Sequence, residues 1–192
     1  MGEITFRTAT EADFPVITGM YELLNAYFYQ MGYRLPHPEN VGQVWLDSFR
    51  KTMGRFSNVF IAELTDPEER GHSSSVRGHS SSVRGTRIAG FMLCRLKRVP
   101  ATMGGVIVGE LSDMWIIPEA RRMGLGDKLS RLAIDWLRSQ DAHSIEIQVL
   151  RDNDASWKLY DRMGFQLEYR VGRLLWEDYD HYLSQLPDQN NS

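Results

Sequence analysis

Residues 106–127 read VIVGELSDMWIIPEARRMGLGD, and this stretch decides the fold. Its first half has the apolar content of a central strand that is buried on both faces, yet Glu110, Ser112 and Asp113 lie in its middle. A buried carboxylate lowers stability unless it has a partner or a chemical task. The stretch therefore predicts a sheet with a functional site in it.

The second half, Pro118 to Asp127, is typical of a strand-to-helix turn that binds an anion. Gly124 and Gly126 let the backbone approach a ligand because they carry no Cβ. Free N–H groups at the start of the next helix suit a phosphate, and Arg121 and Arg122 add charged donors. A turn without a ligand is the alternative. The sequence has neither the third glycine of a dinucleotide fingerprint nor the Gly-Lys-Ser/Thr of a P-loop.

Hydrophobic periodicity predicts the elements around this stretch. Thr10 and Asp13 have the spacing of a capping box that opens the first helix. Because strands come in runs with helices between them, we expect an α/β fold with α+β layers and a mixed sheet. The predicted strands cover residues 4–8, 58–64, 87–97, 106–117, 144–150 and 165–171, and the predicted helices 14–30, 39–52, 124–140 and 153–163.

A tandem duplication lies between the second and third predicted strands: residues 71–77 read GHSSSVR, and residues 78–84 repeat it. Its polar composition cannot bury a core, so we expect a mobile loop over residues 65–86. Arg77 and Arg84 could contact an anionic ligand, and a hairpin loop that tolerates insertion is the alternative.

Composition and charge limit the class of protein. The chain has 192 residues and a net charge of -3, which argues against a nucleic-acid-coating protein. The single cysteine, Cys94, excludes an intramolecular disulfide. We find no signal-peptide pattern and no run near the roughly 18 apolar residues that span a membrane, so we expect a cytoplasmic protein. We expect one domain over residues 1–175. A tail would follow over residues 176–192 and form either a strand end or a helix.

A second motif lies downstream, where residues 153–165 read NDASWKLYDRMGF. Asn153 stands seven residues before Tyr160, and Gly-Phe follows. Together with the R-x-x-G-x-G of residues 121–126, this motif resembles the GNAT superfamily of N-acetyltransferases, which use acetyl-coenzyme A. The resemblance implies the GNAT acyl-CoA N-acyltransferase fold, a mostly antiparallel sheet with a splayed central strand flanked by helices.

The resemblance also implies a coenzyme site. The central strand would separate from its neighbour at a bulge, and its backbone groups at Met114, Trp115 and Ile116 would pair with the pantetheine arm. Asn153 would lie near that arm. The coenzyme's pyrophosphate would lie on the loop formed by Arg121, Arg122, Met123, Gly124, Leu125, Gly126 and Asp127.

For catalysis, the resemblance implies that Glu110, eleven residues before Arg121, is the general base that deprotonates an incoming ammonium. Binding a cationic substrate or pairing with an arginine is the alternative. Asp113, expected on the other face of the strand, is a second candidate base or a structural anchor. Tyr160 would protonate the leaving thiolate, or else pack with its hydroxyl in water.

The acceptor region is the least specified. The resemblance implies that this region shapes the acceptor pocket, so Tyr29 or Tyr33 would line it, and packing in the core is the alternative. Cys94, among apolar neighbours, is expected to be a core thiol, which favours direct transfer in a ternary complex. We therefore expect acetyl transfer to a primary amine, either a small or antibiotic-like molecule or a protein N-terminus or lysine, with a non-catalytic acyl-CoA sensor as the alternative of another class. No metal spacing is found among the histidines, and a homodimer is compatible with the resemblance.

Overall fold

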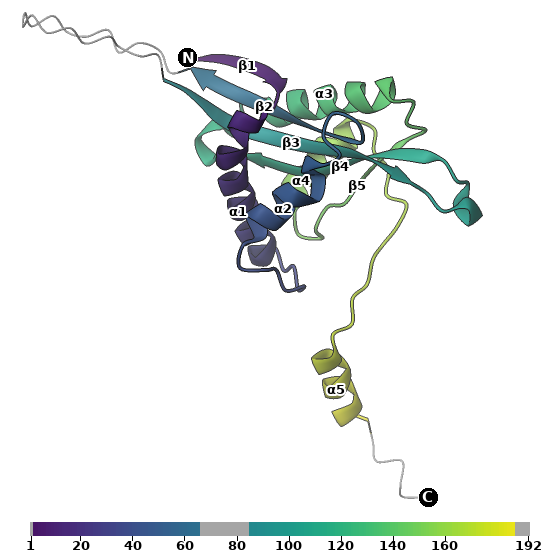
Figure 1. Cartoon of the computed structure of the whole chain (residues 1–192). Helices are drawn as coiled ribbons and strands as arrows, with labels where there is room; N and C mark the ends of the chain where they lie inside the picture. The colour runs from purple at the N-terminus through teal and green to yellow at the C-terminus, as the bar shows by residue number, and fades with distance from the viewer. Residues whose placement is uncertain (1, 66–84, 187–192) are drawn as a thin grey trace, which may run out of the picture. The chain divides into compact units, whose positions relative to one another are not determined.

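The computed structural model describes residues 2–65 and 85–186, and its main feature is a five-stranded sheet (Figure 1). The strand order is β1-β2-β3-β4-β5, with every neighbouring pair antiparallel except β4 and β5, which run parallel. The predicted mixed, mostly antiparallel sheet is confirmed. The strands are β1 (Glu3–Thr8), β2 (Ser57–Thr65), β3 (Thr86–Arg98), β4 (Ile107–Ile116) and β5 (Ile145–Ile147).

Helices cover both faces of this sheet: α1 (Phe14–Gln30) and α2 (Val41–Arg50) pack on one face and α3 (Leu125–Ser139) on the other (Figure 1). The first face buries apolar side chains of both helices and three strands. Its fully or almost fully buried members include Ile17, Phe49, Val59, Ile61, Phe91 and Leu93. Strands β2, β3 and β4 are therefore covered on both sides, as their apolar sequences predict.

The start of α1 is fixed by a network of charged groups. The Asp13 carboxylate accepts the Thr10 backbone N–H at 2.7 Å, which closes the predicted capping box. Arg7, on β1, donates two hydrogen bonds to Asp13, at 2.7 and 2.8 Å, and a third to Glu63 on β2 at 2.7 Å. The Arg7 guanidinium holds the pKa of Asp13 well below its usual range.

The described residues divide into two units after Leu159, within α4 (Asp154–Arg162). The second unit contains α5 (Trp176–Ser184), so the first part of the predicted tail forms a helix rather than a strand end. The strand predicted over residues 165–171 is wrong, because that segment forms neither helix nor strand. Leu167, Tyr169 and Val171 are 59%, 67% and 87% exposed. Alternating apolar residues make a segment able to pair, but a strand also needs a partner's hydrogen bonds.

The GHSSSVR duplication lies outside the described residues. None of the described helices has the length and apolar content that crossing a bilayer requires.

Replacing Asp13 with asparagine removes the ion pair with Arg7. Because the folded-state pKa of Asp13 is depressed, its stabilisation is fully present above the unfolded value of about 3.9 and is lost as the pH falls. We expect Asp13→Asn to lower the free energy of unfolding by about 2 kcal/mol at neutral pH. Urea unfolding at several pH values should show that the free energies of unfolding of wild type and Asp13→Asn become equal in acid. Asp47→Asn, which changes an exposed carboxylate on α2, is the control. Parallel pH profiles of wild type and Asp13→Asn would contradict the assignment.

Candidate active site

Strand β4 contains a bulge at Ser112. The bulge gives β4 one residue more than the segment of β3 that it pairs with. Before the bulge Glu110 lies opposite Arg95, and after it Asp113 lies opposite Leu93. Leu93 and Arg95 are two residues apart in β3 and share one face of the sheet, so their cross-strand partners share it too. The prediction that Asp113 lies on the other face from Glu110 is therefore wrong, because the bulge shifts the alternation by one residue.

Glu110 is held on that face by an ion pair. Its side chain is only 8% exposed, and its Oε2 accepts hydrogen bonds from Arg95 Nε and, at 3.1 Å, from the Ser112 hydroxyl. The Arg95 side chain is 49% exposed. The expected alternative, pairing of Glu110 with an arginine, is thus present in the structure, and the role of general base stays a prediction.

Asp113 connects β4 to the helices above it. The Trp45 indole Nε1 on α2 donates to Asp113 Oδ2 at 3.0 Å, and Tyr21 on α1 stacks on Trp45 with 4.5 Å between ring centroids. Burial raises the pKa of Asp113, and the hydrogen bond from Trp45 opposes this rise. Burial and the Asp113 charge also raise the pKa of Tyr21. These contacts favour the structural-anchor role for Asp113.

Beyond the bulge, β4 has an open edge. Among the described strands, β5 pairs with residues 109–111 of β4 and no further, because it is shorter than predicted. The Ile117 N–H donates to the Ala89 carbonyl of β3 at 3.0 Å. Backbone groups alternate along a strand, so the N–H groups of Met114 and Ile116 point away from β3. This edge has the form expected for pairing with an extended ligand.

The loop after β4 forms a cradle of backbone N–H groups. Gly124 has a φ of 78° and Arg122 a φ of 64°, both left-handed, and Gly124 is the N-cap of α3. The Lys128 N–H donates to the Gly124 carbonyl, so the amides of residues 125–127 precede the first intrahelical bond. Such amides, beside two exposed arginines, fit a pyrophosphate.

Side-chain contacts join this loop to the open edge. Arg121 Nε donates to the Ile116 carbonyl at 3.1 Å, and its guanidinium lies 4.9 Å from the centre of the Trp115 ring. A Cβ on Gly126 would lie 3.4 Å from the Ile116 side chain and 3.5 Å from the Met114 sulfur. The anion cradle and the open strand edge are therefore adjacent parts of one surface.

A comparison with protein families matches residues 18–165, well over half of the chain, to the acetyltransferase (GNAT) family. The chain belongs to this family. The GNAT resemblance read from the sequence is thus confirmed.

Curated relatives match over shorter stretches. The mycothiol acetyltransferase of Renibacterium salmoninarum is 35% identical over 79 residues, which cover 41% of this chain and 23% of that protein. N-alpha-acetyltransferase 30 of Schizosaccharomyces pombe is 27% identical over 79 residues, covering 41% of this chain and 51% of that protein. The matched stretch is thus about a quarter to a half of these relatives' own length.

Solved structures share the GNAT fold over most of the chain. Aminoglycoside N-acetyltransferase AAC(6')-Iy, in complex with CoA, has a TM-score of 0.63 at 15% identity, covering 91% of this chain and 95% of that one. A tetramutant of the BH1408 protein of Bacillus halodurans has a TM-score of 0.63 at 18% identity, covering 89% of this chain and 99% of that one. At these identities the likeness shows the fold.

The second GNAT motif has a visible structural role at its start. Asn153 caps α4, since its Oδ1 accepts the Ser156 N–H at 3.3 Å. Tyr160 belongs to the second unit, where it is buried and its ring lies 5.5 Å from that of Phe165. The coenzyme contact of Asn153 and the acid role of Tyr160 stay predictions.

The two tyrosines predicted to wall the acceptor pocket differ in their contacts. The Tyr29 hydroxyl accepts the His37 N–H at 2.8 Å and donates to the Leu35 carbonyl at 3.0 Å, so it holds the segment after α1. Tyr33 packs 5.0 Å from the His37 ring and contributes to the raised pKa of Tyr21. Of the two, Tyr33 is thus the one whose charge acts on Tyr21, the residue that stacks on Trp45.

Cys94 is fully buried on β3, and its thiol donates to the Asn58 carbonyl at 3.6 Å. Burial raises the pKa of this thiol to about 12. A neutral thiol is a poor nucleophile, which agrees with its predicted role in the core.

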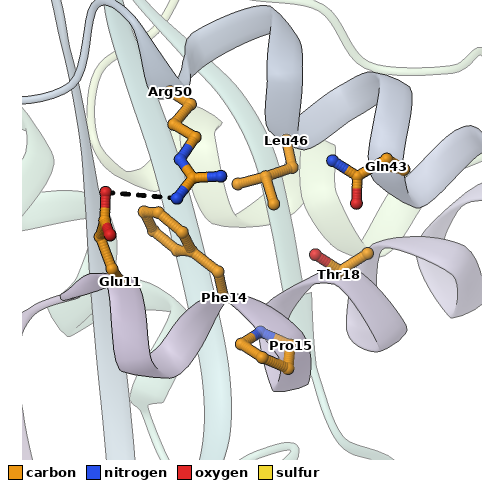
Figure 2. A pocket seen from close by; sticks show the side chains of 7 residues that line it. All are labelled: Glu11, Phe14, Pro15, Thr18, Gln43, Leu46 and Arg50. Atoms are coloured by element: carbon orange, nitrogen blue, oxygen red, sulfur yellow. Dashed lines mark ion pairs between the residues drawn. The ribbon is translucent and has the colours of Figure 1, made fainter.

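A hollow of about 330 Å³ lies between α1 and α2 (Figure 2). One end is closed by Arg50 and Glu11, whose charged atoms are 3.4 Å apart, with the guanidinium 5.9 Å from the Phe14 ring. None of its lining residues belongs to β4 or to the loop after it. Within residues 2–65 and 85–186, no three His, Cys, Asp or Glu side chains form a group that could hold a metal ion.

Three members of the site are not identified as such from the sequence: Tyr21, Trp45 and Arg95. The helical spacing of Tyr21 and Trp45 predicts inward side chains, and both are indeed covered, but spacing does not show that Trp45 faces a carboxylate. Arg95 carries a usable signal, because it is the first charge after the apolar run from Ile88 to Cys94.

Trp45→Phe removes the indole donor but keeps an aromatic ring in place. Since the lost hydrogen bond opposes the effect of burial, we expect the pKa of Asp113 to rise further and the free energy of unfolding to fall by about 2 kcal/mol. Carbon-13 NMR of the Asp113 carboxyl group against pH, together with urea unfolding, checks both effects. Trp136→Phe on α3 is the control. An unchanged Asp113 titration would show that this hydrogen bond is absent in solution.

Proposed function

We propose that this GNAT protein transfers the acetyl group of acetyl-coenzyme A to a primary amine, by direct attack in a ternary complex. The observation that carries the proposal is the continuous surface formed by the open edge of β4 and the N–H cradle at the start of α3. Glu110 lies on the same strand, two residues before the bulge that begins this edge.

The backbone of β4 would bind the coenzyme. The N–H and C=O groups of Met114 and Ile116 would pair with the amide groups of the pantetheine arm, as an added strand does. The pyrophosphate would accept hydrogen bonds from the amides of residues 122–127, and Arg121 and Arg122 would add charge-assisted hydrogen bonds. Gly126 keeps the approach free of a side chain.

When bound, acetyl-coenzyme A supplies a thioester whose carbonyl carbon is attacked by an uncharged amine nitrogen. Glu110 would take the proton that an incoming ammonium must lose before its nitrogen can attack. Tyr160 would give a proton to the sulfur as the carbon–sulfur bond breaks. Because the Cys94 thiol is buried and neutral, the acetyl group would pass to the amine without a covalent acetyl-enzyme.

A small or antibiotic-like amine is the acceptor we favour. Glu110 and Asp113 lie on one face beneath α1 and α2, where two carboxylates would attract an ammonium group. The fold likeness to an aminoglycoside N-acetyltransferase is compatible with this class. The similarity to N-alpha-acetyltransferase 30 favours a protein N-terminus as the second candidate. Release of coenzyme A with a panel of amines and peptides separates the two, and no release with any acceptor would favour the sensor role.

Acetyl-coenzyme A should bind through the loop after β4. We expect the ligand at 100 times its dissociation constant to stabilise the protein by about 2.7 kcal/mol, a clear rise in Tm. Replacing Arg121 with Gln and Arg122 with Asn should weaken binding at least about tenfold, because charge-assisted hydrogen bonds are lost. Calorimetry measures this, with Arg138→Gln at the far end of α3 as the control. Equal affinities in all three proteins would place the pyrophosphate elsewhere.

Glu110→Gln keeps the shape of the side chain but removes its ability to accept a proton. At neutral pH we expect kcat to fall about 100-fold or more, with the affinity for acetyl-coenzyme A unchanged. Steady-state release of coenzyme A and calorimetry give the two quantities. The fall should be smaller at high pH, where more of the acceptor amine is already uncharged. Full activity in the variant would show that another group is the base.

A further inference from the structure

The Arg95–Glu110 ion pair lies where the acceptor's ammonium group is expected. Both recorded contacts of the Glu110 carboxylate, from Arg95 Nε and from the Ser112 hydroxyl, fall on one oxygen, Oε2. Ser112 comes from the bulge of the same strand, and Arg95 is therefore the cationic partner from the neighbouring strand.

The two partners differ sharply in exposure. The Glu110 side chain is 8% exposed and that of Arg95 is 49% exposed. Glu110 is thus fixed in the sheet, whereas the guanidinium is half in water. The guanidinium can leave only when another cation takes its place, because a buried carboxylate without a partner is strongly destabilising. The charge of Arg95 also acts on Asp113, the other carboxylate on this face.

We propose that Arg95 is a placeholder for the acceptor: its guanidinium occupies the Glu110 carboxylate until a cationic amine displaces it. Arg95 is then a specificity-determining residue, because only an acceptor that carries a positive charge can replace the guanidinium without leaving Glu110 unpaired. This inference rests on the proposed function, in which Glu110 receives the acceptor's ammonium group.

A neighbouring ion pair provides a matched control. Lys97 follows Arg95 by two residues on β3 and pairs with Glu146 of β5, which lies directly opposite Glu110. The Lys97 side chain is 47% exposed, close to the value for Arg95. Replacing Lys97 removes the same charge from the same face without removing a hydrogen bond from Glu110, on which Lys97 acts only through its charge.

The first test observes the ion pair directly. The protein, with nitrogen-15 in its arginines and saturated with coenzyme A, is titrated with 1,4-diaminobutane while the Arg95 Nε–H resonance is followed by NMR. Displacement predicts that this resonance shifts and exchanges faster with water as the diamine binds. Sodium chloride of equal ionic strength should leave it in place. The proposal is overturned if the Arg95 resonance does not shift when the diamine is added, or if sodium chloride shifts it by the same amount.

The second test uses the diamine affinity of three variants. Arg95→Gln should bind 1,4-diaminobutane about fivefold more tightly than wild type, because the competing cation is gone. Lys97→Gln should gain much less affinity than Arg95→Gln, because Lys97 acts on Glu110 only through its charge. Arg95→Lys should restore the wild-type affinity. If Arg95 only orients Glu110, Arg95→Gln would bind the diamine no better. An Arg95→Gln affinity no higher than that of wild type would overturn the proposal. So would equal gains in affinity for Arg95→Gln and Lys97→Gln, or a failure of all the proteins to bind the diamine.

These outcomes remain separate from those for the proposed function. Loss of coenzyme binding or full activity of Glu110→Gln would contradict the proposed function, whatever Arg95 does. If the protein binds the coenzyme and Glu110→Gln loses activity, the proposed function stands. An Arg95 resonance that does not move with the diamine in wild type would then contradict the placeholder role alone.

Discussion

One extra residue, Ser112, sets the geometry on which the rest of the site depends. Without it, β4 would alternate regularly, and Asp113 would face α3 rather than the Trp45 side chain of α2. The bulge also lies immediately after the last pair between β4 and β5, so the strand continues with one edge open. A single insertion thus brings two carboxylates onto one face and exposes the backbone that would bind the coenzyme.

The two carboxylates so placed are costly to bury, and the fold gives each a different kind of partner. Glu110 has a charged partner from β3 that is half exposed, so that interaction can be exchanged for another cation. Asp113 has a neutral donor, the Trp45 indole, which is itself packed against Tyr21 and Phe91. The exchangeable partner suits a residue that meets substrate, and the packed partner suits a residue that ties a helix to the sheet.

The sequence predicts the layers, most elements and the anion loop, because periodicity, the capping box at Thr10 and the glycines act locally. It fails where the outcome depends on a partner strand. The bulge at Ser112 is visible only in the pairing with β3, so the face of Asp113 was predicted wrongly. The segment 165–171 alternates as a strand does but has no strand paired with it among the described residues. Arg95 was missed because its partner, Glu110, is distant in sequence.

The central claim, that the open edge of β4 takes up the coenzyme as an added strand, can be tested at single amides. Hydrogen exchange measured by NMR, with and without saturating acetyl-coenzyme A, reports each backbone N–H of residues 113–116. The account predicts slower exchange at Met114 or Ile116, whose N–H groups point away from β3, and little change at Trp115, which points toward it. Unchanged exchange at both Met114 and Ile116, in protein shown by calorimetry to have bound the coenzyme, would contradict it.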